Sequence, residues 1–105
     1  MKVVYSKQAQ NDLHEIYEYI AYSLLSPENA SSTANRIMDV VRSLETMAER
    51  NPLYKEEPWK SKGVRFAIAR NYMIFYTINA DTEIVSILRI MYGGRDVSRQ
   101  LKRDF

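Results

Sequence analysis

Basic and aromatic side chains that could contact phosphate gather in the second half of the chain. Cations neutralise phosphates and aromatic rings stack on bases, so such a set suits nucleic-acid contacts. RNA cleavage can also run without histidine if Lys or Arg stabilises the developing phosphate charge and a Tyr or an acid moves the proton. Arg89 has a structural alternative, which is pairing with an acid such as Asp96. The candidates are Tyr54, Lys60, Lys62, Arg65, Arg70, Tyr72, Arg89, Tyr92, Arg95 and Arg99.

The single histidine and the acids of the first half offer less chemistry. His14 stands between Asp12 and Glu15, and with Glu18 these acids recur at a spacing of three. That spacing is typical of the solvent face of an amphipathic helix, so we expect all four side chains to be solvated. The chain has no cysteine for a thiolate site and too few histidines for a histidine-ligated metal. We therefore expect no metal and no cofactor.

The composition indicates one soluble domain over residues 1–105, with 46% hydrophobic and 27% charged residues. No apolar run approaches the roughly 18 to 20 residues of a membrane span, and the first residues lack a secretory signal, so we expect a cytoplasmic protein. Residues 1–52 carry five Lys/Arg against seven Asp/Glu, a net of −2, whereas residues 53–105 carry ten against six, a net of +4. The basic half could therefore face an anionic partner, either nucleic acid or an acidic peptide.

Two amphipathic helices are predicted after a short β-prone segment at residues 2–5. Ser6 is a good N-cap for the first helix, and Ser26 with Pro27 starts the second. Asn51-Pro52 ends the second helix. The connection between the helices is short, so we expect an antiparallel hairpin. The two apolar stripes consist of Ala9, Leu13, Ile16, Tyr17, Ile20 and Leu24, and of Ala30, Ala34, Ile37, Val41, Leu44 and Ala48.

Three strand-like runs follow a loop at residues 53–63. They are joined by turn signals at residues 70–71 and 79–82, which predicts an antiparallel meander. Alternation along the last run places Arg89 and Met91 on one face and Leu88, Ile90 and Tyr92 on the other. Gly93-Gly94 predicts an exit turn that needs positive φ. The order β-α-α-β-β-β predicts an α+β two-layer domain in which the helical hairpin packs on an antiparallel sheet.

Several motifs of this chain occur together in one known family. The first helix reads D-L-x-x-I-x-x-Y-I-A from Asp12, the first strand of the meander begins G-V-R at Gly63, and the next reads Y-M-I-F-Y from Tyr72. The last strand ends I-L-R-I-x-Y-G-x-R-D at Asp96. In this order, over almost the whole chain, the motifs resemble the RelE/ParE superfamily of type II toxin–antitoxin toxins, which includes plasmid stabilisation proteins.

The resemblance implies a growth-inhibiting toxin that is blocked by a cognate antitoxin, usually encoded beside it. In that family the antitoxin lays an extended or helical C-terminal segment, often acidic, across the toxin, which would suit the cationic half here. Operator DNA would be contacted only through the antitoxin, and no membrane partner is implied. A homodimer and a heterotetramer with the antitoxin both stay open.

Met73 favours one of the two branches of the superfamily. RelE-like members resemble ribosome-dependent endoribonucleases, which carry an arginine just after the aromatic position that Tyr72 matches. Met73 occupies that place here and cannot stabilise a phosphorane. ParE-like members resemble inhibitors of DNA gyrase without recognised catalytic residues, and their ending H-G-R-R-D is similar to the ending here, with Tyr92 at the histidine position and Gly94 at the first arginine.

The first hypothesis is therefore a ParE-like toxin that acts by binding DNA gyrase. The alternative is a RelE-like ribosome-dependent mRNA endoribonuclease using Arg65 or Arg70, Arg95, and Lys60 or Lys62 for phosphate charge, with Tyr92 moving the proton. A third hypothesis is a degenerate toxin that acts only in an autoregulatory complex with its antitoxin. The expected target- or antitoxin-binding residues are Lys60, Lys62, Arg65, Arg70, Tyr72, Arg89, Tyr92, Arg95 and Arg99.

Overall fold

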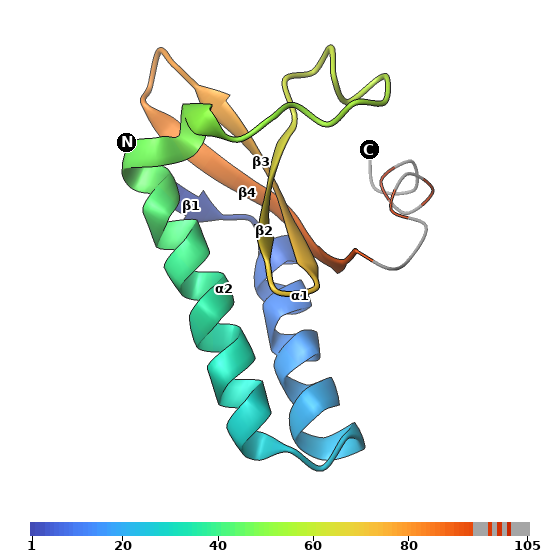
Figure 1. The fold of residues 1–105 in the computed structure, drawn as a ribbon. Coiled ribbons are helices and arrows are strands. Elements are labelled where there is room, and N and C mark those ends of the chain that lie inside the picture. Colours follow the sequence, from blue (N-terminus) through green and yellow to red (C-terminus); the bar gives the residue numbers. More distant parts are fainter. Residues whose placement is uncertain (94–96, 98, 100, 102–105) are drawn as a thin grey trace.

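Two helices pack on a four-stranded sheet in this computed structural model, which describes residues 1–93 together with Val97, Arg99 and Leu101 (Figure 1). This confirms the predicted α+β class. In chain order the elements are β1 (Lys2–Tyr5), α1 (Lys7–Glu18), the π-helical turn η1 (Tyr19–Ser23), α2 (Pro27–Met47), the 3₁₀ turn η2 (Ala48–Arg50), β2 (Arg65–Ala69), β3 (Tyr72–Asn79) and β4 (Ile84–Tyr92).

The sheet has the strand order β1-β4-β3-β2. The strands β2, β3 and β4 form the predicted antiparallel meander. The first strand, β1, joins it in parallel beside β4, from Lys2 opposite Ile84 to Tyr5 opposite Ile87. The sheet is therefore mixed. A parallel pair needs a long connection, and here the helical hairpin, β2 and β3 lie between β1 and β4 in the chain.

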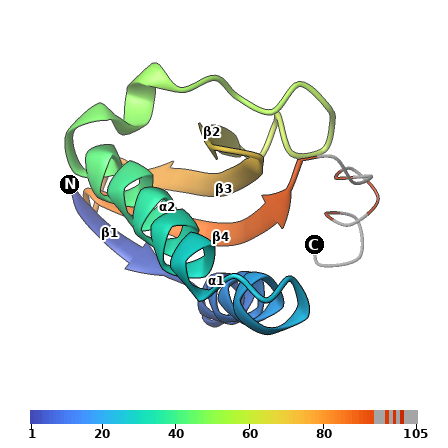
Figure 2. The same cartoon turned by 60° about the horizontal axis from the view of Figure 1, so that its bottom comes forward.

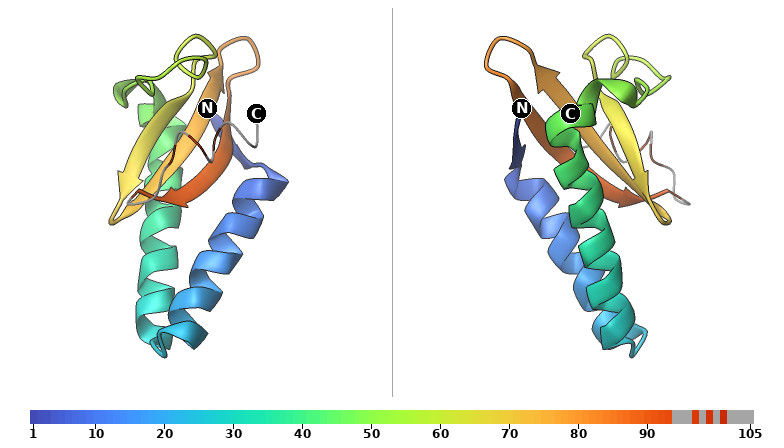
Figure 3. Two further views of the ribbon diagram at one scale, coloured as in Figure 1. Left: turned by 90° about the vertical axis from the view of Figure 1, so that its right-hand side faces the viewer. Right: turned by 60° about the vertical axis from the view of Figure 1, so that its left-hand side comes forward.

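The helices begin where the sequence indicates. The Ser6 hydroxyl accepts a hydrogen bond from the Ala9 N–H at 3.0 Å, as expected of an N-cap, and Pro27 occupies the first turn of α2. Along the sheet, α2 crosses one face, while α1 runs beside β4 (Figure 2). Both helices extend past the end of the sheet as a hairpin (Figure 3). The main core lies beneath them and includes Ile37, Val41, Leu44, Ile74, Tyr76, Val85, Ile87 and Ile90.

The opposite face of the sheet is covered by the loop at residues 53–63 and by the two buried tail residues Val97 and Leu101. Tyr54 of the loop packs edge-on against Phe75 of β3, with ring centroids 5.5 Å apart. Trp59 is only 1% exposed. The loop predicted from the absence of periodicity is therefore present, and it closes a second apolar core.

A bulge in β4 changes which side chains share a face. Phe75 pairs with Arg89, but the next residue of β3, Tyr76, pairs with Ile87, which leaves Leu88 as the extra residue. Ile90 consequently packs in the main core and Leu88 in the second core. The prediction that Leu88 and Ile90 lie on one face is therefore wrong, because a bulge breaks the two-residue alternation on which it depended.

Candidate binding groove

A groove of about 940 Å³ lies where the helical hairpin meets the end of the sheet. Its helical wall comes from α1, η1 and the start of α2, and its sheet wall from the turn between β2 and β3 and the end of β4. Figure 3 shows how these elements are arranged. The lining residues are Asp12, Glu15, Ile16, Tyr19, Ile20, Leu24, Asn29, Thr33, Arg70, Asn71, Tyr72, Arg89, Met91, Tyr92 and Val97. Four of the sequence-predicted candidates therefore share one site, namely Arg70, Tyr72, Arg89 and Tyr92.

The wall of the groove contains a buried ion pair between Asp12 and Arg89. Arg89 donates from Nε to Asp12 Oδ2 at 2.7 Å and from Nη2 to Asp12 Oδ1 at 3.0 Å. The Ile90 N–H donates to the same carboxylate at 2.9 Å. Both charged side chains are 8% exposed. The prediction that Asp12 is solvated is therefore wrong. Arg89 does pair with an acid, Asp12, while Asp96 lies outside the described residues.

The position of α1 explains why this carboxylate reaches β4. Strand β1 ends at Tyr5, so the later part of β4 has no strand beside it on that edge. There the chain continues as α1, and the Ser6 N–H and hydroxyl donate to the carbonyls of Ile87 and Leu88 at 2.9 and 3.0 Å. Asp12 then accepts from Ile90 one helical turn and a half further on. Ser6 and Asp12 thus satisfy backbone groups of β4 that a longer β1 would have paired.

Arg70 stands on the sheet side of the groove, in the turn between β2 and β3. Its guanidinium donates to Thr33 Oγ1 at 2.9 Å and to Ser32 Oγ at 2.6 Å, both on α2. The backbone of Arg70 is left-handed, with φ 55°. The predicted turn at residues 70–71 is therefore confirmed, and it is fastened to the helical hairpin.

Aromatic rings occupy both walls. Tyr72 and Tyr92 pack edge-on with centroids 5.9 Å apart, and Tyr92 is 46% exposed. Across the groove Tyr19 is 56% exposed. Their phenol groups offer flat apolar surface together with a hydroxyl, a combination common at protein interfaces.

An exposed apolar patch continues the groove over the tip of the hairpin. This tip patch consists of Tyr19, Tyr22, Leu24 and Leu25, of which Leu25 is 84% exposed. The prediction that Leu24 belongs to the buried stripe of the first helix is wrong, since Leu24 is 55% exposed. The wider π turn is the cause: the Leu24 N–H donates to the Tyr19 carbonyl, five residues back, which shifts the helical phase.

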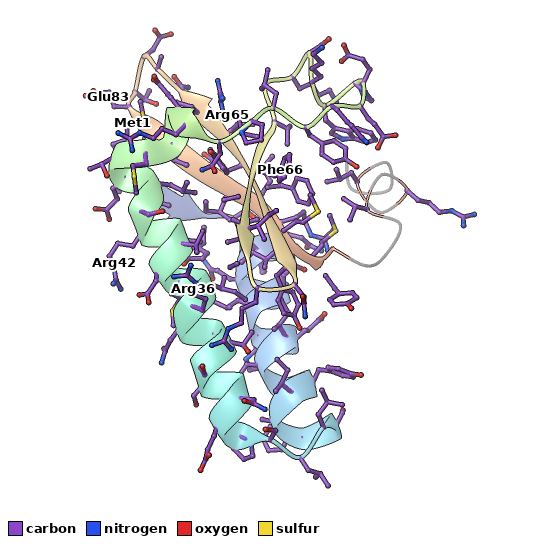
Figure 4. All side chains as sticks on the ribbon, viewed as in Figure 1. Met1, Arg36, Arg42, Arg65, Phe66 and Glu83 are labelled. Carbon is purple, nitrogen blue, oxygen red and sulfur yellow. The ribbon has the colours of Figure 1, made fainter. Side chains whose placement is uncertain are left out.

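The other predicted site residues lie elsewhere. Arg65 is roughly 16 Å from Arg70 along β2, from the rise of an extended strand, and it donates to the carbonyls of Asn51 at 2.6 Å and Glu49 at 3.3 Å. Figure 4 shows Arg65 near the end of η2, away from the hairpin tip. Lys60 and Lys62 are exposed on the loop at that same end. Arg99 is exposed, while Gly94, Arg95 and Asp96 lie outside the described residues.

Met73 belongs to the second core and does not line the groove. It is half-buried near Gly93, where an added Cβ would lie 3.4 Å from both Met73 Cγ and the Asn71 carbonyl oxygen. The absence of a side chain at Gly93 therefore permits this close packing. The φ of Gly93 is not in the left-handed region, so the prediction of a positive φ is wrong at this position.

Two tyrosines that do not line the groove have raised pKa values. Burial raises the pKa of Tyr76, whose hydroxyl donates to the Ala48 carbonyl at 2.5 Å, and burial also raises the pKa of Tyr5. His14 is exposed and contacts Glu18 one turn along α1. Among the residues that the structure describes, no three His, Cys, Asp or Glu side chains gather as metal ligands. No helix in this described part is both long and apolar enough to cross a membrane.

Comparisons with known proteins agree with this architecture. A structure titled "Chromosomal ParDE TA system from P. aeruginosa" matches with a TM-score of 0.71 and 24% identity, over 88% of this chain and 95% of that one. A toxin–antitoxin complex, RelBE2 from Mycobacterium tuberculosis, matches with a TM-score of 0.61 and 20% identity, over 87% and 95%. No curated protein matched. A family model described as "ParE toxin of type II toxin-antitoxin system, parDE" matches residues 3–97, more than half of the chain. This chain therefore belongs to the ParE toxin family of type II toxin–antitoxin systems.

Proposed function

We propose that this toxin acts by binding DNA gyrase, without cleaving RNA, and that a cognate antitoxin neutralises it. The observation that carries the proposal is the place of Met73. The position at which the resemblance puts the arginine of the nuclease branch is occupied here by an apolar side chain of the second core. That core also contains Phe75, Met91 and Leu101. A developing phosphate charge needs hydrogen-bond donors and cations, and this packing supplies neither.

The arginines of the nuclease hypothesis support the same conclusion. Arg89 is neutralised by Asp12 inside the fold. Arg65 is engaged with two backbone carbonyls at the far end of β2. These two cations therefore stabilise the fold, whereas a phosphoryl-transfer site would have to direct them at a substrate.

The groove and the tip patch support an activity that depends on binding. Four large apolar or aromatic side chains within residues 19–25 are exposed at the hairpin tip, and exposed apolar patches often mark protein–protein contact sites. The groove adds aromatic rings and Arg70, which are residue types enriched in protein interfaces.

One observation favours the endoribonuclease as a second candidate. Arg70 and Tyr92 line the same groove, so a cation and a proton donor are available together. In that case Arg70→Gln and Tyr92→Phe would each abolish cleavage of translated mRNA.

The test is a supercoiling assay with purified gyrase, run beside primer extension on mRNA in a reconstituted translation reaction. We expect the toxin to inhibit supercoiling and to leave the mRNA intact. Addition of the short acidic-tailed protein encoded beside the toxin should restore supercoiling. Growth inhibition with normal supercoiling and cut mRNA would refute the proposal in favour of the nuclease, and absence of any growth effect would favour the degenerate toxin.

A further inference from the structure

We propose that Arg70 is a specificity contact for the antitoxin. In this arrangement an amphipathic antitoxin segment occupies the groove, presents an Asp or Glu carboxylate to Arg70, and places apolar side chains against Ile16 and Tyr19 of the opposite wall. The identity of the occupant rests on the proposed function, whereas the chemistry of the contact is argued from the groove itself.

The conformation of Arg70 is the first observation. Its φ of 55° lies in the left-handed region, where glycine or asparagine is accommodated at lower cost than a long side chain. An arginine here brings a cation to the rim of the groove from a tight turn that is itself fixed by the pairing of Ala69 with Tyr72. Strain of this kind points to a role for the side chain that a glycine could not fill.

The guanidinium of Arg70 is also held in place before any partner arrives. The hydroxyls of Ser32 and Thr33 accept one hydrogen bond each from its two terminal nitrogens, at 2.6 and 2.9 Å. Both acceptors are neutral, so they orient the group without cancelling its charge. The remaining N–H donors suit a carboxylate, which guanidinium binds through parallel hydrogen bonds.

The two walls of the groove differ in charge. Arg89 is compensated by Asp12 in the wall, but no ion pair involves Arg70 within the described part of the chain. On the opposite wall, Glu15 of α1 is exposed. A complementary partner therefore carries its acid toward the β2–β3 turn and is neutral or basic toward α1.

The apolar surface indicates a polypeptide as the occupant. The groove of about 940 Å³ is at the upper end of small-molecule sites, and the tip patch extends it through two shared residues, Tyr19 and Leu24. A small anion would leave this surface uncovered. A nucleic acid would place successive phosphates beside Glu15 as well as Arg70, which like-charge repulsion disfavours.

The test measures the affinity of the antitoxin encoded beside the toxin by calorimetry, at two salt concentrations. Arg70→Gln removes the charge and should weaken binding by about 10- to 100-fold, the range for a lost charge-assisted hydrogen bond. Arg70→Lys should fall between, because an ammonium keeps the charge but not the parallel donors. The matched control is Arg42→Gln, an exposed arginine on the outer side of α2 (Figure 4), which should bind within about twofold of wild type.

A charge exchange separates recognition from support of the turn. Each Asp and Glu of the antitoxin is changed to Lys in turn, and one of these variants should lose affinity for wild type and regain it with Arg70→Glu. The Ser32→Ala/Thr33→Val double variant keeps the cation but loses its orientation, so it should weaken binding by only a few-fold. Thermal melting of each variant checks that the fold is intact.

Each contrary result has a distinct meaning. Wild-type affinity for Arg70→Gln would overturn the inference and leave the toxin function standing. Weaker binding by Arg70→Gln with no charge exchange that restores it would overturn the carboxylate contact, and so would an Arg70 effect on RNA binding alone. Failure of the wild-type chain to bind the antitoxin would overturn the proposed function together with this inference.

Discussion

Replacing Asp12 by alanine should destabilise the fold more than replacing an exposed acid such as Glu15. The change removes the partner of a buried guanidinium and the acceptor of the Ile90 N–H at once. It also removes the hydrogen bond by which α1 holds the edge of β4 beyond the end of β1. The groove wall would then lose the side chain that neutralises Arg89.

The expected loss follows from these contacts. Removing one partner of a buried ion pair costs about 3–5 kcal/mol, and a backbone N–H left without its acceptor adds about 1 kcal/mol. A domain of this size is stable by about 5–15 kcal/mol in total. A loss of about 4 kcal/mol would therefore consume a large share of the stability and lower Tm by roughly 20 °C.

Urea denaturation followed by circular dichroism measures this loss. Glu15→Ala is the matched control, since Glu15 is an exposed acid on the same helix, and it should change the free energy of unfolding by less than about 0.5 kcal/mol. Asp12→Leu combined with Arg89→Met should be less damaging than Asp12→Ala alone, because no charge is left buried. The ion pair does not stabilise the fold as argued if Asp12→Ala has the same free energy of unfolding as the control. The same holds if the losses caused by Asp12→Leu and Arg89→Met alone add up to the loss in the double variant.

Three further outcomes are expected. Arg65→Ala should lower the free energy of unfolding by about 2 kcal/mol, through loss of its two bonds to carbonyls, while growth inhibition below the melting range persists; loss of toxicity in a folded variant would contradict this. Burial raises the pKa of Tyr76, so folding favours its neutral form. The contribution of Tyr76 to the free energy of unfolding is therefore full below the unfolded pKa of 10.0 and falls as the pH rises beyond it. Tyr76→Phe should reduce this alkaline loss of stability in urea titrations at successive pH values. Leu25→Gly should raise Tm slightly by relieving a left-handed backbone (φ 52°), yet weaken antitoxin binding, and unchanged affinity in calorimetry would exclude Leu25 from the interface.

Local rules account for what could be predicted of the fold. Ser6 caps α1 and Pro27 opens α2 because capping chemistry depends only on neighbouring residues. The turns at residues 70–71 and 79–82 were predictable for the same reason; in the second, the Asn79 side chain accepts from the N–H groups of Asp81 and Thr82. The order of helices and strands and the α+β class were predictable from the hydrophobic periodicity, since the apolar stripes of two helices must be buried against a sheet.

The site depended on contacts that no local rule contains. Asp12 has the spacing of a solvated acid, and its partner lies 77 residues further along the chain. The bulge that displaces Leu88 and the π turn that exposes Leu24 both change a period within one element. Asp12 and Leu24 line the groove, and the bulge immediately precedes Arg89, which also lines it. Departures from regular geometry are expected near functional sites.

The groove therefore contains two arginines with opposite roles, although the sequence offered both as binding candidates. Arg89 pairs with Asp12 because β1 ends at Tyr5 and α1 lies beside the rest of β4. The charge of Arg89 is therefore compensated within the fold. Within the described part of the chain, Arg70 hydrogen-bonds to hydroxyls, because the turn that carries it faces Ser32 and Thr33 on α2. The same guanidinium thus stabilises the protein where a carboxylate of its own chain reaches it. Where only neutral groups reach it, the charge stays available for the carboxylate of a partner, and partner choice should depend on Arg70.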